Sequence, residues 1–177
     1  DEPSPPPTQK AIFAFGNASA GNTNISNLVS SSGVFASDTT GVGTARRELA
    51  AAGYGLDKAI FAYGNDSAGG FNAVSMSNLV NNSGVVATDV SGVGTARATL
   101  AACGYGGDKA IFGYGTTGSV VSLSNLVNNS GVIATDVTGV GTERRQLAAA
   151  TYGNDKAIFG YGNTGSRVSL TNLVNNS

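Results

Sequence analysis

The sequence lacks several residue types that enzymes and metal proteins commonly use. It has no His, no Trp and a single Cys, and only 12% of its residues are charged, against about 25% in typical domains. The missing His removes the commonest general base and metal ligand at neutral pH. The single Cys103 excludes an intrachain disulfide and a thiolate zinc cluster. We therefore expect a protein that is not an enzyme and that uses neither a metal nor a cofactor.

Charge and hydrophobicity argue against two further classes of protein. Ten Lys and Arg against eleven Asp and Glu give a net charge of -1, which is not the basic footprint of a nucleic-acid binder. No stretch approaches the roughly 18 consecutive apolar residues that a membrane span needs. The hydrophobic content of 41% is still enough for a core. We expect a folded chain that binds no nucleic acid and does not insert into a membrane.

What the sequence does contain is a repeat. One block of 29 residues occurs three times without a gap, beginning GVFASD at Gly33, GVVATD at Gly84 and GVIATD at Gly131. The copies start 51 and 47 residues apart, so every change of length falls between blocks. The blocks are therefore predicted to be packed structure. Exposed loops are predicted in the connecting segments, at 16–25, 64–74, 115–121 and 162–168.

Within a repeat the local pattern is typical of β-structure. Leu49–Tyr54 and Lys58–Gly64, joined by a Gly-Leu-Asp turn, predict a hairpin. Ser77–Val80 predicts a third strand and Gly84–Asp89 a fourth. The Leu-Ala-Ala-Ala run would suit a helix by propensity, but its glycines, its Tyr and its shortness favour a strand. The sequence predicts an all-β fold of tandem four-stranded antiparallel repeats of 47–51 residues.

These elements resemble known propeller repeats. An Arg-containing corner, a strand of small residues and a strand ending in glycine, as in Arg46–Gly64, resemble the first half of a kelch repeat. The run Tyr63–Gly69 is similar to an RCC1-type blade. The KAIFGYG, GVVATD and GVGTAR segments resemble tandem repeats of marine phage and metagenomic proteins. The resemblance implies a β-propeller-like fold of about three and a half blades with the Ala-rich strand innermost. It also implies an extracellular, cell-surface or virion-surface location.

The chain departs from kelch in having one Gly where that family has a pair, and in lacking an outer-strand Trp. Residues 1–9 are expected to form a proline-rich N-terminal tail or linker. The β-repeat domain is expected over 10–177, with units at about 10–57, 58–108, 109–155 and, in part, 156–177. A partial unit leaves strand edges without partners. We therefore expect that the natural chain is longer or that its ends associate with other copies of itself.

Two charged positions recur in the blocks. They are Asp38, Asp89 and Asp136 in a corner, and Arg46, Arg97 and Arg144 eight residues later. The carboxylates could bind Ca²⁺, but one carboxylate per repeat is a poor cage, and local Asx turns are the favoured interpretation. The arginines could form an anion-binding ring or pair at the junctions between blades. Their repetition favours a structural role.

Four aromatic residues lie in or beside the variable loops: Tyr63, Phe71, Tyr114 and Tyr161. Aromatic rings beside Asn, Ser and Thr suit weak contacts with glycans, which repetition would strengthen. Surface loops are commonly polar and variable without any such role. The favoured function is a non-catalytic structural or surface scaffold, built by self-association or as part of a longer chain. The alternatives are a glycan-binding lectin or adhesin, and an enzyme completed by further sequence.

Overall fold

The computed structural model describes residues 10–176, and the predicted tail at 1–9 lies outside them. Within these residues the chain has eleven strands and no helix, which confirms the all-β class. The strands form one two-stranded and three three-stranded sheets. The strands are β1 (Ala11–Ala18), β2 (Gly21–Val29), β3 (Ala50–Tyr54), β4 (Lys58–Ala62), β5 (Ser77–Val80), β6 (Ala101–Tyr105), β7 (Lys109–Gly113), β8 (Ser124–Val127), β9 (Ala148–Tyr152), β10 (Lys156–Gly160) and β11 (Thr171–Val174).

We number the sheets as units. Unit 1 holds β1 and β2, unit 2 holds β3–β5, unit 3 holds β6–β8 and unit 4 holds β9–β11. In units 2 to 4 the Ala-rich strand pairs antiparallel with the KAIF strand, which pairs with the Asn-Leu-Val strand; in unit 2, Ala52 lies opposite Ile60 and Ile60 opposite Leu79. The hairpin between β3 and β4 turns at Gly55 and Leu56, both with positive φ. The predicted hairpin and the strand assignment of the Ala-rich run are confirmed.

The predicted fourth strand is not a continuous strand. In unit 2 the segment 84–90 meets β5 through two isolated bridges, Val80 to Val86 and Ser77 to Val90. The side chain of Asn78 donates to the carbonyl of Ala87 at 3.0 Å, and this bond takes the place of a regular rung of the ladder. Each of units 2 and 3 therefore has three regular strands and a bridged fourth segment rather than four strands.

Unit 1 differs from the others between its two strands. β1 and β2 form one long hairpin in which Gly16 lies opposite Thr23, so most of the predicted loop 16–25 is strand, and that loop prediction is wrong. A bulge between Ala14 and Gly16 accommodates the positive φ of Phe15 and lets the pairing continue past it. In the other units the loops 64–74, 115–121 and 162–168 lie outside the strands, as predicted.

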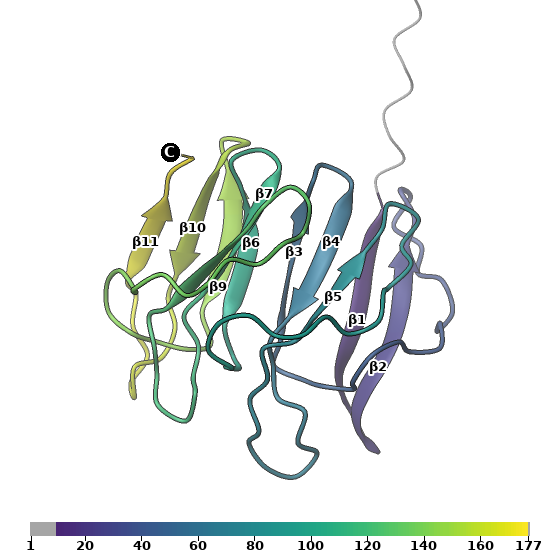
Figure 1. The fold of residues 1–177 in the computed structure, drawn as a ribbon, viewed down its shortest axis with the longest axis horizontal. Helices are drawn as coiled ribbons and strands as arrows, with labels where there is room; N and C mark the ends of the chain where they lie inside the picture. Colours follow the sequence, from purple (N-terminus) through teal and green to yellow (C-terminus); the bar gives the residue numbers. More distant parts are fainter. Residues whose placement is uncertain (1–9, 177) are drawn as a thin grey trace, which may run out of the picture.

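The four sheets stand in a row that follows the chain, with unit 1 at one end and unit 4 at the other (Figure 1). The Ala-rich strands β3, β6 and β9 are neighbours in this row. They lie close enough that the hydroxyl of Thr151 donates to the carbonyl of Gly104 at 2.8 Å, and a Cβ on Gly104 would lie 3.3 Å from that hydroxyl oxygen. A larger side chain at Gly104 would therefore have to displace Thr151.

The core lies between successive sheets. Ala50, Ala52, Ile60 and Tyr63 of unit 2 pack against Phe112 and other apolar residues of unit 3, and a second cluster joins unit 3 to unit 4. Each three-stranded sheet crosses a predicted unit boundary; for example, β3 from 10–57 pairs with β4 from 58–108. The sheet of unit 1 lies within 10–57. No helix in the described part of the chain is long and apolar enough to cross a membrane.

Candidate functional site

The recurring arginines lie between successive units, beneath the surface. Arg97 is fully buried, and its guanidinium carbon lies 4.2 Å from the centre of the Tyr63 ring of unit 2. Its Nε donates to the carbonyl of Tyr114 at 2.9 Å, and its Nη1 donates to the carbonyl of Thr95 at 3.2 Å. Arg97 therefore connects unit 2 to unit 3 by stacking on one side and by hydrogen bonds on the other.

The same arrangement occurs at the two other contacts between units. Arg46 lies 4.2 Å from the ring of Phe15, and Arg144 lies 4.1 Å from the ring of Tyr114. We call each such contact between successive units a joint. Burial lowers the pKa of Arg46 to about 10, against the charge of Asp89, which raises it. Arg46 therefore stays cationic at neutral pH.

The recurring aspartates complete two of the joints. The carboxylate of Asp136 accepts the N–H of Thr95 at 3.0 Å, the Thr95 hydroxyl at 2.6 Å and the side-chain amide of Asn125 at 2.9 Å. It also lies 3.9 Å from Nη1 of Arg97. Asp89 bonds Thr44 and Asn78 in the same way. The predicted local Asx turns are wrong here, because the backbone N–H that each carboxylate accepts comes from a corner more than forty residues earlier in the chain.

These hydrogen bonds change the ionisation of both carboxyl groups. Burial raises the pKa of Asp136, but hydrogen bonds from Thr95 and Asn125 and the charge of Arg97 outweigh it and leave the pKa below the usual 3.8. The pKa of Asp89 is lowered against burial for the corresponding reasons. Both groups are carboxylates at neutral pH, as the ion pairs with the arginines require.

Asp38, the first recurring aspartate, and Arg144, the last recurring arginine, lack the ion pair that their counterparts make among the described residues. Asp38 accepts the side-chain amide of Asn27 at 2.7 Å, but no Thr or Arg corner within residues 10–176 contacts it. In the joint between units 3 and 4, Arg144 donates to the side-chain oxygen of Asn172 at 2.7 Å, and it forms no ion pair among residues 10–176. Within the described residues, the ion pair between a recurring Arg and a recurring Asp therefore forms in the joint between units 1 and 2 and in the joint between units 2 and 3.

The predicted ligand-binding aromatics fall into two groups. Tyr63 and Tyr114 are buried in joints, with an arginine on one face and the edge contact of a Phe at 5.5 Å, so a ligand cannot reach their rings. Both side chains therefore have a structural role, and the prediction that they contact a sugar is wrong. Phe71 and Tyr161 are exposed. They lie in different units; Phe71 lines a groove to which Tyr161 does not contribute.

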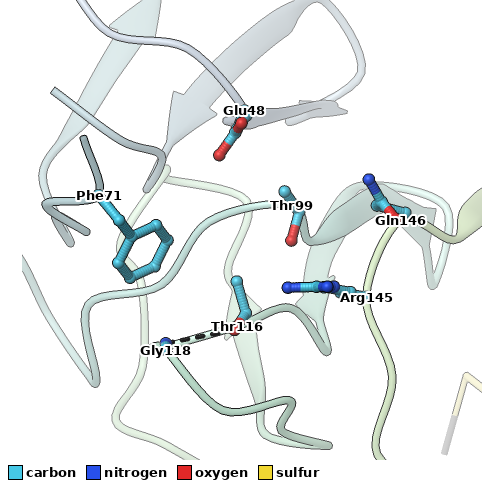
Figure 2. Close-up of a pocket in the computed structure, with 7 residues that line it drawn as sticks. All are labelled: Glu48, Phe71, Thr99, Thr116, Gly118, Arg145 and Gln146. Carbon is cyan, nitrogen blue, oxygen red and sulfur yellow. Dashed lines mark hydrogen bonds between the residues drawn. The ribbon is translucent and has the colours of Figure 1, made fainter. Parts of the chain in front are cut away.

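This groove has a volume of about 450 Å³ and crosses units 2, 3 and 4. Figure 2 shows the ring of Phe71 on one side, the guanidinium of Arg145 on the other, and Glu48, Thr99 and Thr116 between them. Gly118 and Gln146 also line it. A second hollow of about 220 Å³ lies at the hairpin turns between β3, β6 and β9, and Lys58 and Lys109 border it.

Sequence reasoning missed most of the residues in the larger groove. Glu48, Thr99 and Gln146 occupy the same place in successive blocks, and all three have positive φ. Their backbones are linked across the joints, because the N–H of Thr99 donates to the carbonyl of Glu48 at 2.8 Å and that of Gln146 to the carbonyl of Thr99 at 2.9 Å. The available signal was chemical: the three copies differ strongly in residue type at this place, although the surrounding block is nearly constant.

Cys103 lies in β6 and is buried. Burial raises the pKa of its thiol to about 11, so the thiol is protonated and a weak nucleophile at neutral pH. Within residues 10–176 no three His, Cys, Asp or Glu side chains gather in a group that could hold a metal ion.

No protein-family model matches this chain, and no curated protein matches it.

Proposed function

We propose that the chain is a non-catalytic structural or surface protein whose units build a β scaffold and extend it by end-to-end self-association. The observation that carries this proposal is the exposure of both end faces of the row. Aromatic residues whose counterparts in the middle of the row are buried in joints are exposed on these faces.

The first end face belongs to unit 4. In unit 3, Tyr105 and Tyr114 face unit 4 and are buried. The corresponding Tyr152 and Tyr161 of unit 4 have no following unit within the described chain and are 40% and 65% exposed. Leu173 in β11 is 64% exposed. Unit 4 thus presents an apolar face of the kind that packs against a sheet elsewhere in the row.

The second end face belongs to unit 1. Phe61, Phe112 and Phe159 are buried because each receives the aromatic ring of the preceding unit. Phe13 occupies the same place in unit 1 but is 59% exposed; its ring centre lies 5.5 Å from that of Phe35, which is itself exposed. The face of unit 4 and the face of unit 1 are therefore the two halves of one type of joint.

Two different faces that fit each other produce head-to-tail contacts. Such contacts generate an open filament or, where the rotation closes, a ring. Unit 1 has no Ala-rich strand among the described residues, and contacts between Ala-rich strands form a large part of the joints between units 2 and 3 and between units 3 and 4. A joint between copies is consequently weaker than the joints within the row, and its population depends on concentration.

Sedimentation velocity over a wide range of protein concentration tests this proposal. We expect the chain to form larger species as concentration rises, and we expect Leu173→Asp, which places a charge on the face of unit 4, to abolish them. Val132→Asp is the matched control, because Val132 is equally exposed apolar surface on an internal unit. A concentration-independent monomer would contradict self-association and favour faces covered by further repeats of a longer chain.

Glycan binding is the second candidate function. The exposed ring of Phe71, beside a groove lined by hydroxyl, carboxylate and guanidinium groups, favours it. Glycan-array binding that is lost in Phe71→Ala would support it. An array that gives no signal at any concentration of the folded protein would contradict it.

A further inference from the structure

The groove occurs where one residue of the repeat is shortened. Position 47 is Arg, position 98 is Ala and position 145 is Arg in blocks that otherwise align closely. These positions also bridge equivalent partners, since Arg47 pairs with Asn65, Ala98 with Thr116 and Arg145 with Asn163. Unit 3 therefore carries alanine at a place where units 2 and 4 carry a long cationic side chain.

In unit 2 the corresponding space is filled by Arg47. Its guanidinium reaches across the joint to the side-chain oxygen of Asn22 at 3.3 Å and bonds the carbonyls of Ala68 and Gly70 at 3.2 and 3.1 Å. An arginine at position 98 would extend in the same way toward the loop at Gly118 and the edge of unit 2 near Phe71. Thr116, the bridge partner of Ala98, and Phe71 both line the groove, whereas Ala98 itself is fully buried. The Arg-to-Ala difference thus leaves room beside these two residues.

The groove has an unbalanced positive charge. Glu48 at its rim lies 3.8 Å from Nε of Arg47, which partly neutralises it. Arg145 has no carboxylate within 4.0 Å among residues 10–176. Arg145 therefore brings to the groove a positive charge that no carboxylate of the described residues pairs, and an anionic ligand would neutralise it.

The remaining wall is apolar. Phe71 is 46% exposed, and its ring lies opposite Arg145 (Figure 2). The volume of about 450 Å³ is within the range of about 300–1,000 Å³ for small-molecule sites. A pyranose ring has an apolar C–H face for an aromatic ring and hydroxyl groups around its edge. A carboxylate on that sugar supplies the partner of Arg145.

We propose that this groove binds an acidic saccharide, a pyranose that carries a carboxylate. The carboxylate binds the guanidinium of Arg145, the ring stacks on Phe71, and the sugar hydroxyls bond Glu48. This inference rests on the glycan-binding candidate and is independent of self-association, because the end faces contribute no residue to the groove.

Titration with a matched pair of sugars tests the proposal. The probes are methyl α-D-galactopyranosiduronate and methyl α-D-galactopyranoside, which differ only in carrying a carboxylate or a hydroxymethyl group; acetate is the third probe. We expect saturable binding of the acidic sugar by calorimetry and by amide shifts at Thr99 and Gly118, with a Kd of about 1 mM. The neutral sugar and acetate should bind at least about tenfold more weakly, because each lacks one part of the recognition.

Three variants locate the binding. Ala98→Arg introduces the side chain that units 2 and 4 carry at this position and should fill the groove. Arg145→Gln and Phe71→Ala each remove one wall of it. Each of the three variants should weaken the binding of the acidic sugar at least about tenfold. Arg167→Gln is the control for lost charge, because Arg167 is an exposed arginine of unit 4 outside the groove. Leu173→Asp should leave the affinity unchanged, which separates this site from self-association.

Equal binding of acetate and the acidic sugar would overturn the assignment of a saccharide, and equal binding of both sugars would overturn the role of Arg145. Binding that persists in Ala98→Arg with an unchanged thermal midpoint would place the site elsewhere. If Ala98→Arg does not fold, unchanged binding in Arg145→Gln and Phe71→Ala overturns the proposal instead. Absence of saturable binding to every probe also overturns it, whatever the sedimentation experiment shows.

Discussion

Units 3 and 4 carry nearly the same residues but bury them very differently. Tyr114 is 5% exposed and Tyr161 is 65% exposed, although both follow the same KAIFG strand. Tyr105 and Tyr152 differ in the same direction. Unit 3 has a neighbour on each side, whereas unit 4 has one. The comparison shows that the burial of a residue depends on whether its unit forms a joint with a neighbouring unit, and not on its position within the unit.

The polar groups follow the same rule. Arg97 in the joint between units 2 and 3 has a ring, two carbonyls and a carboxylate as partners. Arg144 in the joint between units 3 and 4 has a ring and two carbonyls as partners and donates to the amide oxygen of Asn172, but it has no carboxylate partner among residues 10–176. An ionic contact thus depends on the fourth segment of a complete unit.

The largest expected effect compares two phenylalanines at one repeat position. Phe112→Ala should lower the free energy of unfolding by about 3–5 kcal/mol, because it removes a fully buried ring from a joint. Phe13→Ala removes a ring that is mostly exposed and should cost less than about 1 kcal/mol in the monomer. Urea denaturation followed by tyrosine fluorescence measures both. Equal losses of unfolding free energy in the two variants would refute the idea that burial depends on the joint.

The next effect compares two arginines. Arg97→Ala should destabilise by about 3 kcal/mol, because it leaves buried carbonyls without a donor and removes the partner of Asp136. Arg144→Ala should cost roughly half as much, because no carboxylate depends on it. The same denaturation experiment applies, with Arg167→Gln as an exposed control. A larger loss for Arg144→Ala would contradict the ranking of the two joints.

A smaller effect concerns pH. The folded-state pKa values of Asp89 and Asp136 lie below the usual 3.8, so their contribution to stability is complete above that value. It is lost as pH falls through the folded pKa values. The double variant Asp89→Asn, Asp136→Asn should be less stable at neutral pH and should lose less stability on acidification. Thermal midpoints from pH 7 to pH 2 test this, and parallel curves for both proteins would exclude these carboxylates as the cause.

The smallest expected effect concerns the Ala-rich strands, and it is measured as a rate of thiol reaction. Cys103 in β6 is buried and its thiol has a raised pKa, so it should react slowly with a disulfide reagent at pH 8 and rapidly once unfolded. Ala150 occupies the same place in β9 of unit 4 and is exposed. In a Cys103→Ala background, Ala150→Cys should react quickly in the native state. Equal native rates would show that unit 4 is covered, as in an assembled scaffold, and dilution would then restore the difference.

Much of the fold could be read from residue patterns. The repeat, the hairpin at Gly55 and the Ala-rich strand all depend on neighbours in sequence, where turn chemistry and alternation act. The partner of Asp136 could not be read in this way, because Thr95 lies 41 residues away and the local alternative, an Asx turn, uses the same residue type. The extended hairpin of unit 1 was missed because its bulge leaves no distinctive signal in the sequence.

The low charge and the absent His first suggested a chain that does little chemistry, and the repeat explained why so few residue types occur. By itself the sequence determined the all-β class, the repeating strands and the recurrence of one Asp and one Arg in each block. Only the tertiary structure decided that the arginines are buried on aromatic rings, that two tyrosines are inaccessible, and that a groove crosses units 2, 3 and 4. The physical reason is that strand formation depends on local periodicity, whereas burial, ion pairing and cavities depend on which unit stands beside which.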